Sequence, residues 1–161
     1  FIDTFDKKFG GKDKTYVNSI EPEDVGEITE EQARQEIKEM LGEEPVEIIY
    51  KPENTKFLNA VVDKDLQEAV LYYSVQDKIL NVRIVSRYVK SSTGIEISDK
   101  LLREYSIQLP ETKVSVREYK VLETGEKEYI AQFTYKNSEY FLSGIVNQAE
   151  FEKIIKNLHF F

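Results

Sequence analysis

The chain has 161 residues, a formal net charge of -8 and no Cys, and 40% of its residues are hydrophobic. This composition predicts one folded domain with a real core. Without Cys, the chain has no disulfide, no thiolate metal site and no Cys nucleophile. An acidic surface repels phosphate groups, which argues against nucleic acid and anionic membranes as partners.

The sequence contains no apolar run of about 18 residues or more, the length that a membrane-spanning helix needs. The chain begins with Phe1 rather than Met. We therefore expect that it was trimmed or that a leading segment, a signal peptide or a membrane anchor, precedes it. This favours an extracytoplasmic domain, either secreted or attached to an upstream transmembrane helix.

Residues 1–27 are predicted to be a polar lead or linker, and residues 28–161 a single α+β domain. In the lead, Phe1, Phe5 and Phe9 recur at helical spacing until Gly10-Gly11 interrupts the pattern.

The first firm element is a helix over residues 30–41. Thr29 is a suitable N-cap, and Gln32 three residues later completes a capping box. Gly42 and Pro45 mark the end of the helix. Its apolar residues, Ala33, Ile37, Met40 and Leu41, fall on one face.

Strands dominate the middle of the chain. They are predicted over residues 46–50, 57–62, 66–75, 79–89, 114–122, 128–135 and 140–146. Leu80, Val82 and Ile84 alternate with Asn81, Arg83 and Val85, a period of two that is typical of an antiparallel sheet with one wet face. Residues 95–109 fit either a single helical turn capped by Ser98-Asp99 or an irregular edge strand.

A second helix is predicted over residues 149–158, with Asn147 as N-cap and Glu150 three residues later. Phe151, Ile154, Ile155 and Leu158 form an apolar stripe that must pack on the sheet. The fold class is therefore α+β: a curved antiparallel sheet of six or seven strands, with N-terminal and C-terminal amphipathic helices packed on one face.

Three features of the sequence could indicate chemistry. The single His, His159, cannot form a multi-His metal site and is interpreted as a cation at the end of the last helix. Gly10-Gly11-Lys12 lacks both the spacing of a phosphate loop and a preceding strand. Ser143-Gly144 lies within a strand, where Gly marks a bulge or close packing rather than a nucleophile elbow.

Charged pairs leave alternatives open. Asp63 and Asp65 fit either a calcium site or, as we favour, turn chemistry. Arg83 and Arg87 share one strand face, and Arg117 lies on another strand. They fit either an anion site or, as we favour, pairing with Glu across strands.

Tyrosines are frequent in the predicted strands: Tyr72, Tyr73, Tyr88, Tyr105, Tyr119, Tyr129, Tyr135 and Tyr140. They suit a binding surface, but their strand propensity favours filling of the sheet and core. No residue is assigned as catalytic, cofactor-binding or metal-binding, and no cofactor is predicted.

The segment from Tyr129 to Leu158 resembles the C-terminal signature of a bacterial family of unknown function, DUF4367. Tyr140, Leu142 and Gly144 match its second strand, and Asn147 its helix cap. Glu150, Ile154 and Leu158 match its helix, while Phe133 stands where the family typically has Trp. The resemblance is good over about the last 50 residues and looser over about the last 110.

The resemblance implies an extracytoplasmic domain of Firmicutes proteins, often joined through one transmembrane helix to an anti-sigma or sporulation-related segment. We thus expect a non-enzymatic interaction or sensor domain whose partner is an unidentified protein or envelope ligand. The alternative is a carrier or sensor of a lipid or amphiphile in a half-barrel. A hydrolase using paired carboxylates ranks last.

Overall fold

The structure, a computed structural model, describes residues 28–86 and 99–161. The predicted lead over residues 1–27 lies outside them. The elements, in chain order, are α2 (Glu30–Leu41), β1 (Glu47–Ile48), β2 (Thr55–Asp63), β3 (Glu68–Val75), β4 (Lys78–Ser86), β5 (Lys100–Gln108), β6 (Lys113–Lys120), β7 (Lys127–Tyr135), β8 (Ser138–Gly144), α3 (Gln148–Lys156) and β9 (Leu158–His159).

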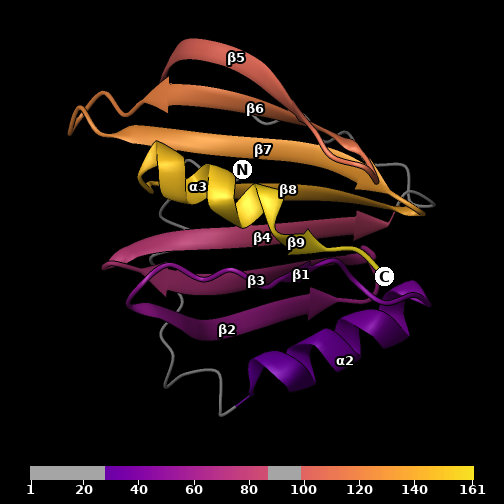
Figure 1. Cartoon of the computed structure of the whole chain (residues 1–161). Coiled ribbons are helices and arrows are strands. Elements are labelled where there is room, and N and C mark those ends of the chain that lie inside the picture. Colours follow the sequence, from indigo (N-terminus) through magenta and orange to yellow (C-terminus); the bar gives the residue numbers. More distant parts are fainter. Residues whose placement is uncertain (1–27, 87–98) are drawn as a thin grey trace.

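Seven strands form one antiparallel sheet in the order β2-β3-β4-β8-β7-β6-β5 (Figure 1). Two meanders build it. β2, β3 and β4 form the first, β5 to β8 form the second, and β8 pairs with β4 to join them. The sheet does not close on itself, so β2 and β5 are its two edges. The predicted α+β class, with a seven-stranded antiparallel sheet and two helices, is confirmed.

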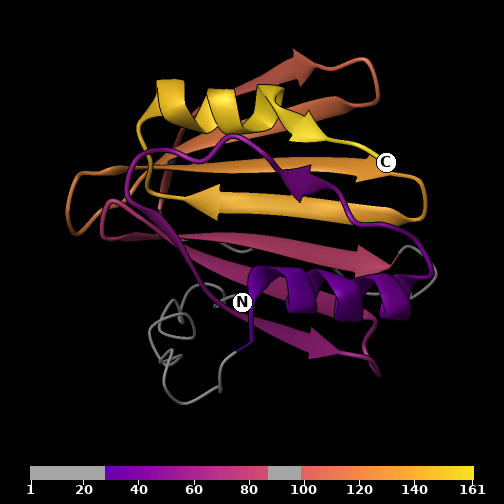
Figure 2. The same cartoon turned by 60° about the horizontal axis from the view of Figure 1, so that its bottom comes forward.

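One face of the sheet carries the core. From α3, Phe151, Ile154 and Ile155 are fully buried on it, and from α2 so are Ala33 and Ile37. Figure 1 shows α3 crossing in front of β7 and β8, and Figure 2 shows α2 in front of the β2–β3 side. Because strand side chains alternate between faces, the sheet supplies every second residue to this core. In β4 these are Leu80, Val82 and Ile84, as predicted.

Local signals set the bounds of α2. The Thr29 side chain accepts a hydrogen bond from the Gln32 amide at 3.0 Å, and the Gln32 side chain accepts one from the Thr29 amide at 2.8 Å. Gly42 ends the helix with φ 77°, a left-handed conformation that glycine adopts at little cost. The predicted helix and both of its caps are confirmed.

The end of the chain differs from the prediction. The last helix stops at Lys156 rather than at Leu158, because Asn157 caps it and donates a side-chain hydrogen bond to the Lys153 carbonyl at 2.8 Å. Leu158 and His159 then form β9, which pairs with β1. His159 is therefore a strand residue opposite Glu47, and its interpretation as a helix-end cation was wrong.

Strand bounds also shift. The predicted strand over 46–50 shrinks to the two residues of β1, because its partner β9 is equally short. Of the two interpretations of residues 95–109, the irregular edge strand is confirmed: β5 carries a register shift between Leu101 and Arg103. Residues 87–89 and 95–98 of the predicted segments lie outside the described residues.

Replacing the buried Phe151 tests the packing of α3 on the sheet. Phe151 is 0% exposed and its ring stacks on Tyr129 at 5.5 Å between centroids. Phe151→Ala should lower the free energy of unfolding by about 3–5 kcal/mol, because it removes contacts and leaves a cavity. Phe161→Ala is the matched control: that side chain is 41% exposed, and we expect a loss below about 1 kcal/mol. Urea denaturation measures both, and equal losses would contradict this packing.

Candidate functional site

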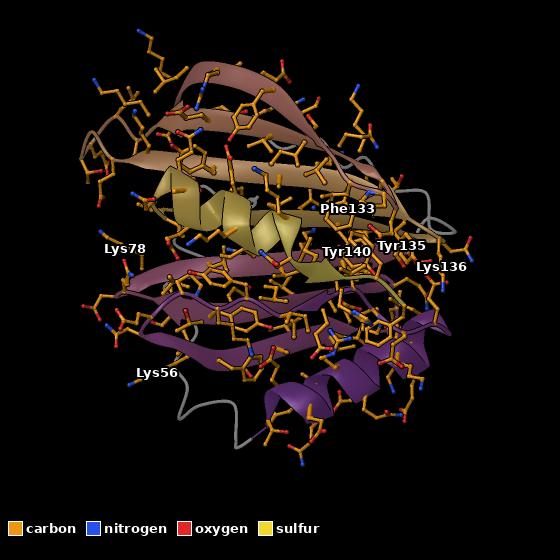
Figure 3. The ribbon with its side chains drawn as sticks, in the orientation of Figure 1. Lys56, Lys78, Phe133, Tyr135, Lys136 and Tyr140 are labelled. Atoms are coloured by element: carbon orange, nitrogen blue, oxygen red, sulfur yellow. The ribbon has the colours of Figure 1, made fainter. Side chains whose placement is uncertain are left out.

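A polar cavity of about 590 Å³ lies at one end of the sheet, beside the start of α3. Three segments meet there: the turn between β3 and β4, the residues at the start of β7, and the segment that connects β8 to α3. The lining residues are Val75, Gln76, Lys78, Glu126, Lys127, Tyr129, Ile145, Val146, Asn147 and Gln148. Lys78 lies at this end of the sheet, and Phe133 and Tyr140 lie toward the opposite end (Figure 3).

Tight turns shape the cavity. Gln76 and Asp77, the two residues between β3 and β4, have φ of 51° and 70°. Paired positive φ values are the hallmark of the hairpin turn whose twist matches the flanking strands. The turn positions Lys78, whose ammonium lies 2.9 Å from the Glu126 carboxylate. This ion pair bridges the two meanders across the cavity mouth.

A buried carboxylate lies next to the cavity. Glu118 of β6 is 3% exposed and points to the core face, where Val114 and Val116 precede it in alternation. Arg103 Nε donates a hydrogen bond to it at 2.9 Å. Lys127 Nζ lies 3.3 Å from its other oxygen.

Tyr129 completes this network. Its hydroxyl donates a hydrogen bond to Glu118 at 3.3 Å. Burial and the neighbouring Glu118 carboxylate raise the pKa of Tyr129 to about 12, so the phenol stays protonated. Burial also acts to raise the pKa of Glu118, but hydrogen bonds and charge from Arg103 and Lys127 outweigh it. The net pKa of Glu118 lies below its ordinary value, so the group is a carboxylate at neutral pH.

A second polar group attaches α3 to β5. The Tyr105 hydroxyl donates to Glu152 at 2.7 Å, and Gln148 Nε2 donates to the same carboxylate at 3.2 Å. The hydrogen bond from Tyr105 leads the effects that lower the pKa of Glu152. Both buried or half-buried glutamates near the cavity are therefore stabilised as anions, which suits structural ion pairs rather than proton donation.

In the structure, two of the predicted arginines form ion pairs with glutamates of neighbouring strands, and Asp63 forms a hydrogen bond within a turn. Arg83 donates to Glu68 through Nε at 2.8 Å and Nη2 at 3.2 Å. Arg117 Nε donates to Glu104 at 2.9 Å. Asp63 accepts the Leu66 amide at 3.0 Å, which is turn chemistry. These favoured interpretations are confirmed, while Arg87 lies outside the described residues.

Gly144 is a close-packing glycine. A Cβ on it would lie 3.1 Å from the Ile79 carbonyl oxygen and 3.2 Å from the Leu80 Cα. The strand position predicted for Ser143-Gly144, with glycine marking close packing, is confirmed. Gly10-Gly11-Lys12 lies outside the described residues.

Tyrosine hydroxyls bond largely to the protein itself. Tyr73 donates to Glu30 of α2 at 2.6 Å, and Tyr50 donates to Glu150 of α3 at 2.5 Å. Tyr140 accepts the Val46 amide at 3.1 Å while its ring stacks on Phe133 at 4.9 Å (Figure 3). These tyrosines fill the core side and tie helices and termini to the sheet, as favoured. Tyr88 lies outside the described residues.

Sequence reasoning missed Glu118 and the cavity. The sequence contains one signal for this site. Val114 and Val116 occupy alternate positions of the strand, and Glu118 places a charged residue at the next position of the same apolar series. The lysines at the cavity carry no such signal, because only the turns bring Lys78 and Lys127 to one place.

The β5 edge is the second notable surface. Leu101 is 49% exposed and Leu102 is 41% exposed, and β5 pairs with β6 alone among the described strands. Leu122, just beyond β6, is 63% exposed. Its amide donates to Asp99 at 3.4 Å, which places it beside the start of β5. Exposed leucines therefore gather at one corner of the sheet.

Two further features concern the described residues. Neither described helix has the length and apolarity needed to cross a bilayer. The described ranges hold no cluster of three or more His, Asp or Glu side chains placed to bind a metal ion.

The structure defines an α+β domain whose seven-stranded sheet packs two helices on one face. On the opposite face Tyr72 and Phe141 are also buried, and the β5 edge pairs with no second strand of the described residues. Residues 45–158 match the family model of a domain of unknown function, DUF4367, and the chain belongs to this family. Comparison with curated proteins and with solved structures finds no match.

The Glu118 network yields a pH-dependent prediction. Glu118→Gln should destabilise the fold at neutral pH by about 1 kcal/mol, the low end for a lost charged hydrogen bond, because Arg103 and Lys127 are half exposed and solvent screens them. A folded pKa below the unfolded one stabilises the protein above the unfolded pKa, and this benefit is lost as pH falls through the folded value. The difference from wild type should therefore shrink on acidification below about pH 4.5.

Chemical denaturation at neutral and acidic pH measures this difference. Glu104→Gln is the control, since Glu104 also pairs with an arginine but its side chain is 53% exposed. A gap that stays constant with pH, or an equal loss in the control, would contradict the network.

Proposed function

We propose that this chain is a non-enzymatic, extracytoplasmic interaction or sensor domain, in the manner of anti-sigma-like envelope signalling proteins. The carrying observation is the open β5 edge, with Leu101 and Leu102 41–49% exposed. An unpaired strand edge offers backbone donors and acceptors to a partner, and exposed leucines add apolar area.

The Glu118 network supports the non-enzymatic part of the proposal. A carboxylate hydrolase needs one carboxyl with a raised pKa to act as an acid. Glu118 is the most buried carboxylate of the described chain, and its pKa is lowered. Its cationic partners, Arg103 and Lys127, form ion pairs that stabilise the folded structure.

The core face bears on the second hypothesis, a lipid or amphiphile carrier. Phe151, Ile154 and Ile155 occupy the face where an apolar ligand would lie. The cavity beside α3 is lined by two lysines, a glutamate and amide side chains, together with Val75, Tyr129, Ile145 and Val146. Such a lining suits a polar or peptide ligand better than an acyl chain, so these features favour the interaction domain.

Thiol labelling in intact cells tests the extracytoplasmic part. The chain has no Cys, so Leu66→Cys, at a 58% exposed position, creates a single thiol. In the native host, a membrane-impermeant maleimide should label this variant before lysis, while a cytoplasmic control protein stays unlabelled. Labelling that appears only after lysis would overturn the extracytoplasmic assignment.

Site-specific photo-crosslinking in living cells tests the interaction part. A photoreactive amino acid at Leu102 should crosslink to a discrete protein partner, because this side chain is exposed beside the open edge. The same group at Leu66, on the β2–β3 turn, is the comparison site. Absence of a discrete crosslink from both positions would contradict an interaction domain, whereas a crosslink from Leu66 alone would place the partner away from β5.

A further inference from the structure

A row of three lysines crosses the sheet at the corner where the leucines are exposed. Lys100 of β5 lies directly opposite Lys120 of β6, and Lys120 lies directly opposite Lys127 of β7. Directly opposite residues of antiparallel strands share a face, with Cβ atoms about 4.5–5.5 Å apart. This face is the one that carries Glu118, two residues before Lys120.

The positive charge of this row is only partly balanced. Lys127 pairs with Glu118 at 3.3 Å, whereas neither Lys100 nor Lys120 forms an ion pair with a described residue. Like charges placed directly opposite each other destabilise a sheet. On a chain with a net charge of -8, a local row of unbalanced lysines is an arrangement that an anionic partner would relieve.

The exposed leucines lie at the same corner. Leu101 and Leu102 follow Lys100 directly, and the Asp99–Leu122 hydrogen bond holds Leu122 against the start of β5. The corner thus combines three elements of recognition: a backbone edge that no second described strand pairs with, apolar side chains and positive charge. An extended peptide that alternates acidic and apolar residues matches all three, because strand addition places alternate side chains on opposite faces.

We propose that the β5 edge, with Lys100 and Lys120, binds an extended acidic segment of a partner protein. The segment adds as a further strand beside β5, and its carboxylates meet the two lysines. This inference rests on the proposed interaction function and names its partner class.

Peptide binding tests the proposal on the full chain. The probe is a fluorescent seven-residue peptide that alternates Glu and Val, and the matched peptide carries Lys in place of each Glu. The acidic peptide should bind in fluorescence anisotropy, with affinity that falls as ionic strength rises. Its NMR amide shifts should concentrate on residues 100–108. The Lys peptide should not bind.

Two charge-matched variants localise the site. Lys100→Glu with Lys120→Glu should weaken binding of the acidic peptide by tenfold or more. Lys56→Glu with Lys64→Glu makes the same change in net charge around the opposite edge, where Lys56 of β2 lies (Figure 3), and should leave the affinity within about twofold. All four lysines are exposed, and circular dichroism checks that both variants fold.

Other outcomes overturn the proposal in distinguishable ways. Equal weakening by both variants would show a nonspecific charge effect, and amide shifts away from β5 would show another site. Binding to vesicles of phosphatidylglycerol and phosphatidylcholine, without binding to the peptide, would replace the protein partner by a membrane. Concentration-dependent dimerisation through β5 would replace it by a second copy. A discrete crosslink from Leu66 without peptide binding at β5 would leave the interaction function standing and remove this site.

Discussion

The pairing of β4 with β8 is the constraint on which the rest of the structure depends. It joins two meanders that come from separate parts of the chain, through pairs that run from Leu80 opposite Gly144 to Ser86 opposite Ser138. Forming it closes a long loop, so the entropy of closure must be offset by packing that only the joined sheet offers. Gly144 shows how close this pairing is, because a Cβ there would lie 3.1 Å from the Ile79 carbonyl. Once β4 and β8 are joined, one continuous core face exists for both helices.

Covering that face leaves the two edges of the sheet unequal. α3 and the β1–β9 pair lie over the middle of the sheet, and α2 lies beside β2 (Figures 1 and 2). No described helix accompanies β5, whose first five residues are exposed. The Tyr105–Glu152 bond ties β5 to α3 from the core face, and β6 is the strand that pairs with β5 among the described residues. The same closure that completes the core therefore leaves β5 as an edge strand among the described residues, and this is the edge at which we propose that a partner binds.

The parts of this fold that were predictable are those with local causes. The bounds of α2 follow from the Thr29–Gln32 capping box and from Gly42, all within one segment of the sequence. The β1–β9 pair was not predictable, since two-residue strands from opposite ends of the domain show no period and depend on where α3 ends. The Glu118 site falls between these cases. Its charge in an apolar alternation is visible in sequence, but Arg103 comes from β5, and Lys127 and Tyr129 come from β7.

Net charge and the local arrangement of charge lead to separate expectations. A charge of -8 argues against polyanions, which contact a wide surface and sense the whole field. At physiological ionic strength, however, exposed charges are screened beyond roughly 8 Å. The proposed partner segment beside β5 would therefore respond to Lys100 and Lys120 more than to glutamates on distant strands. The alignment of Lys100 and Lys120 depends on the register of β5, β6 and β7. The net charge of the sequence gives no information about this register. The acidic composition and the binding that we propose for the Lys100–Lys120 corner are thus compatible, because the net charge and the local charge act over different distances.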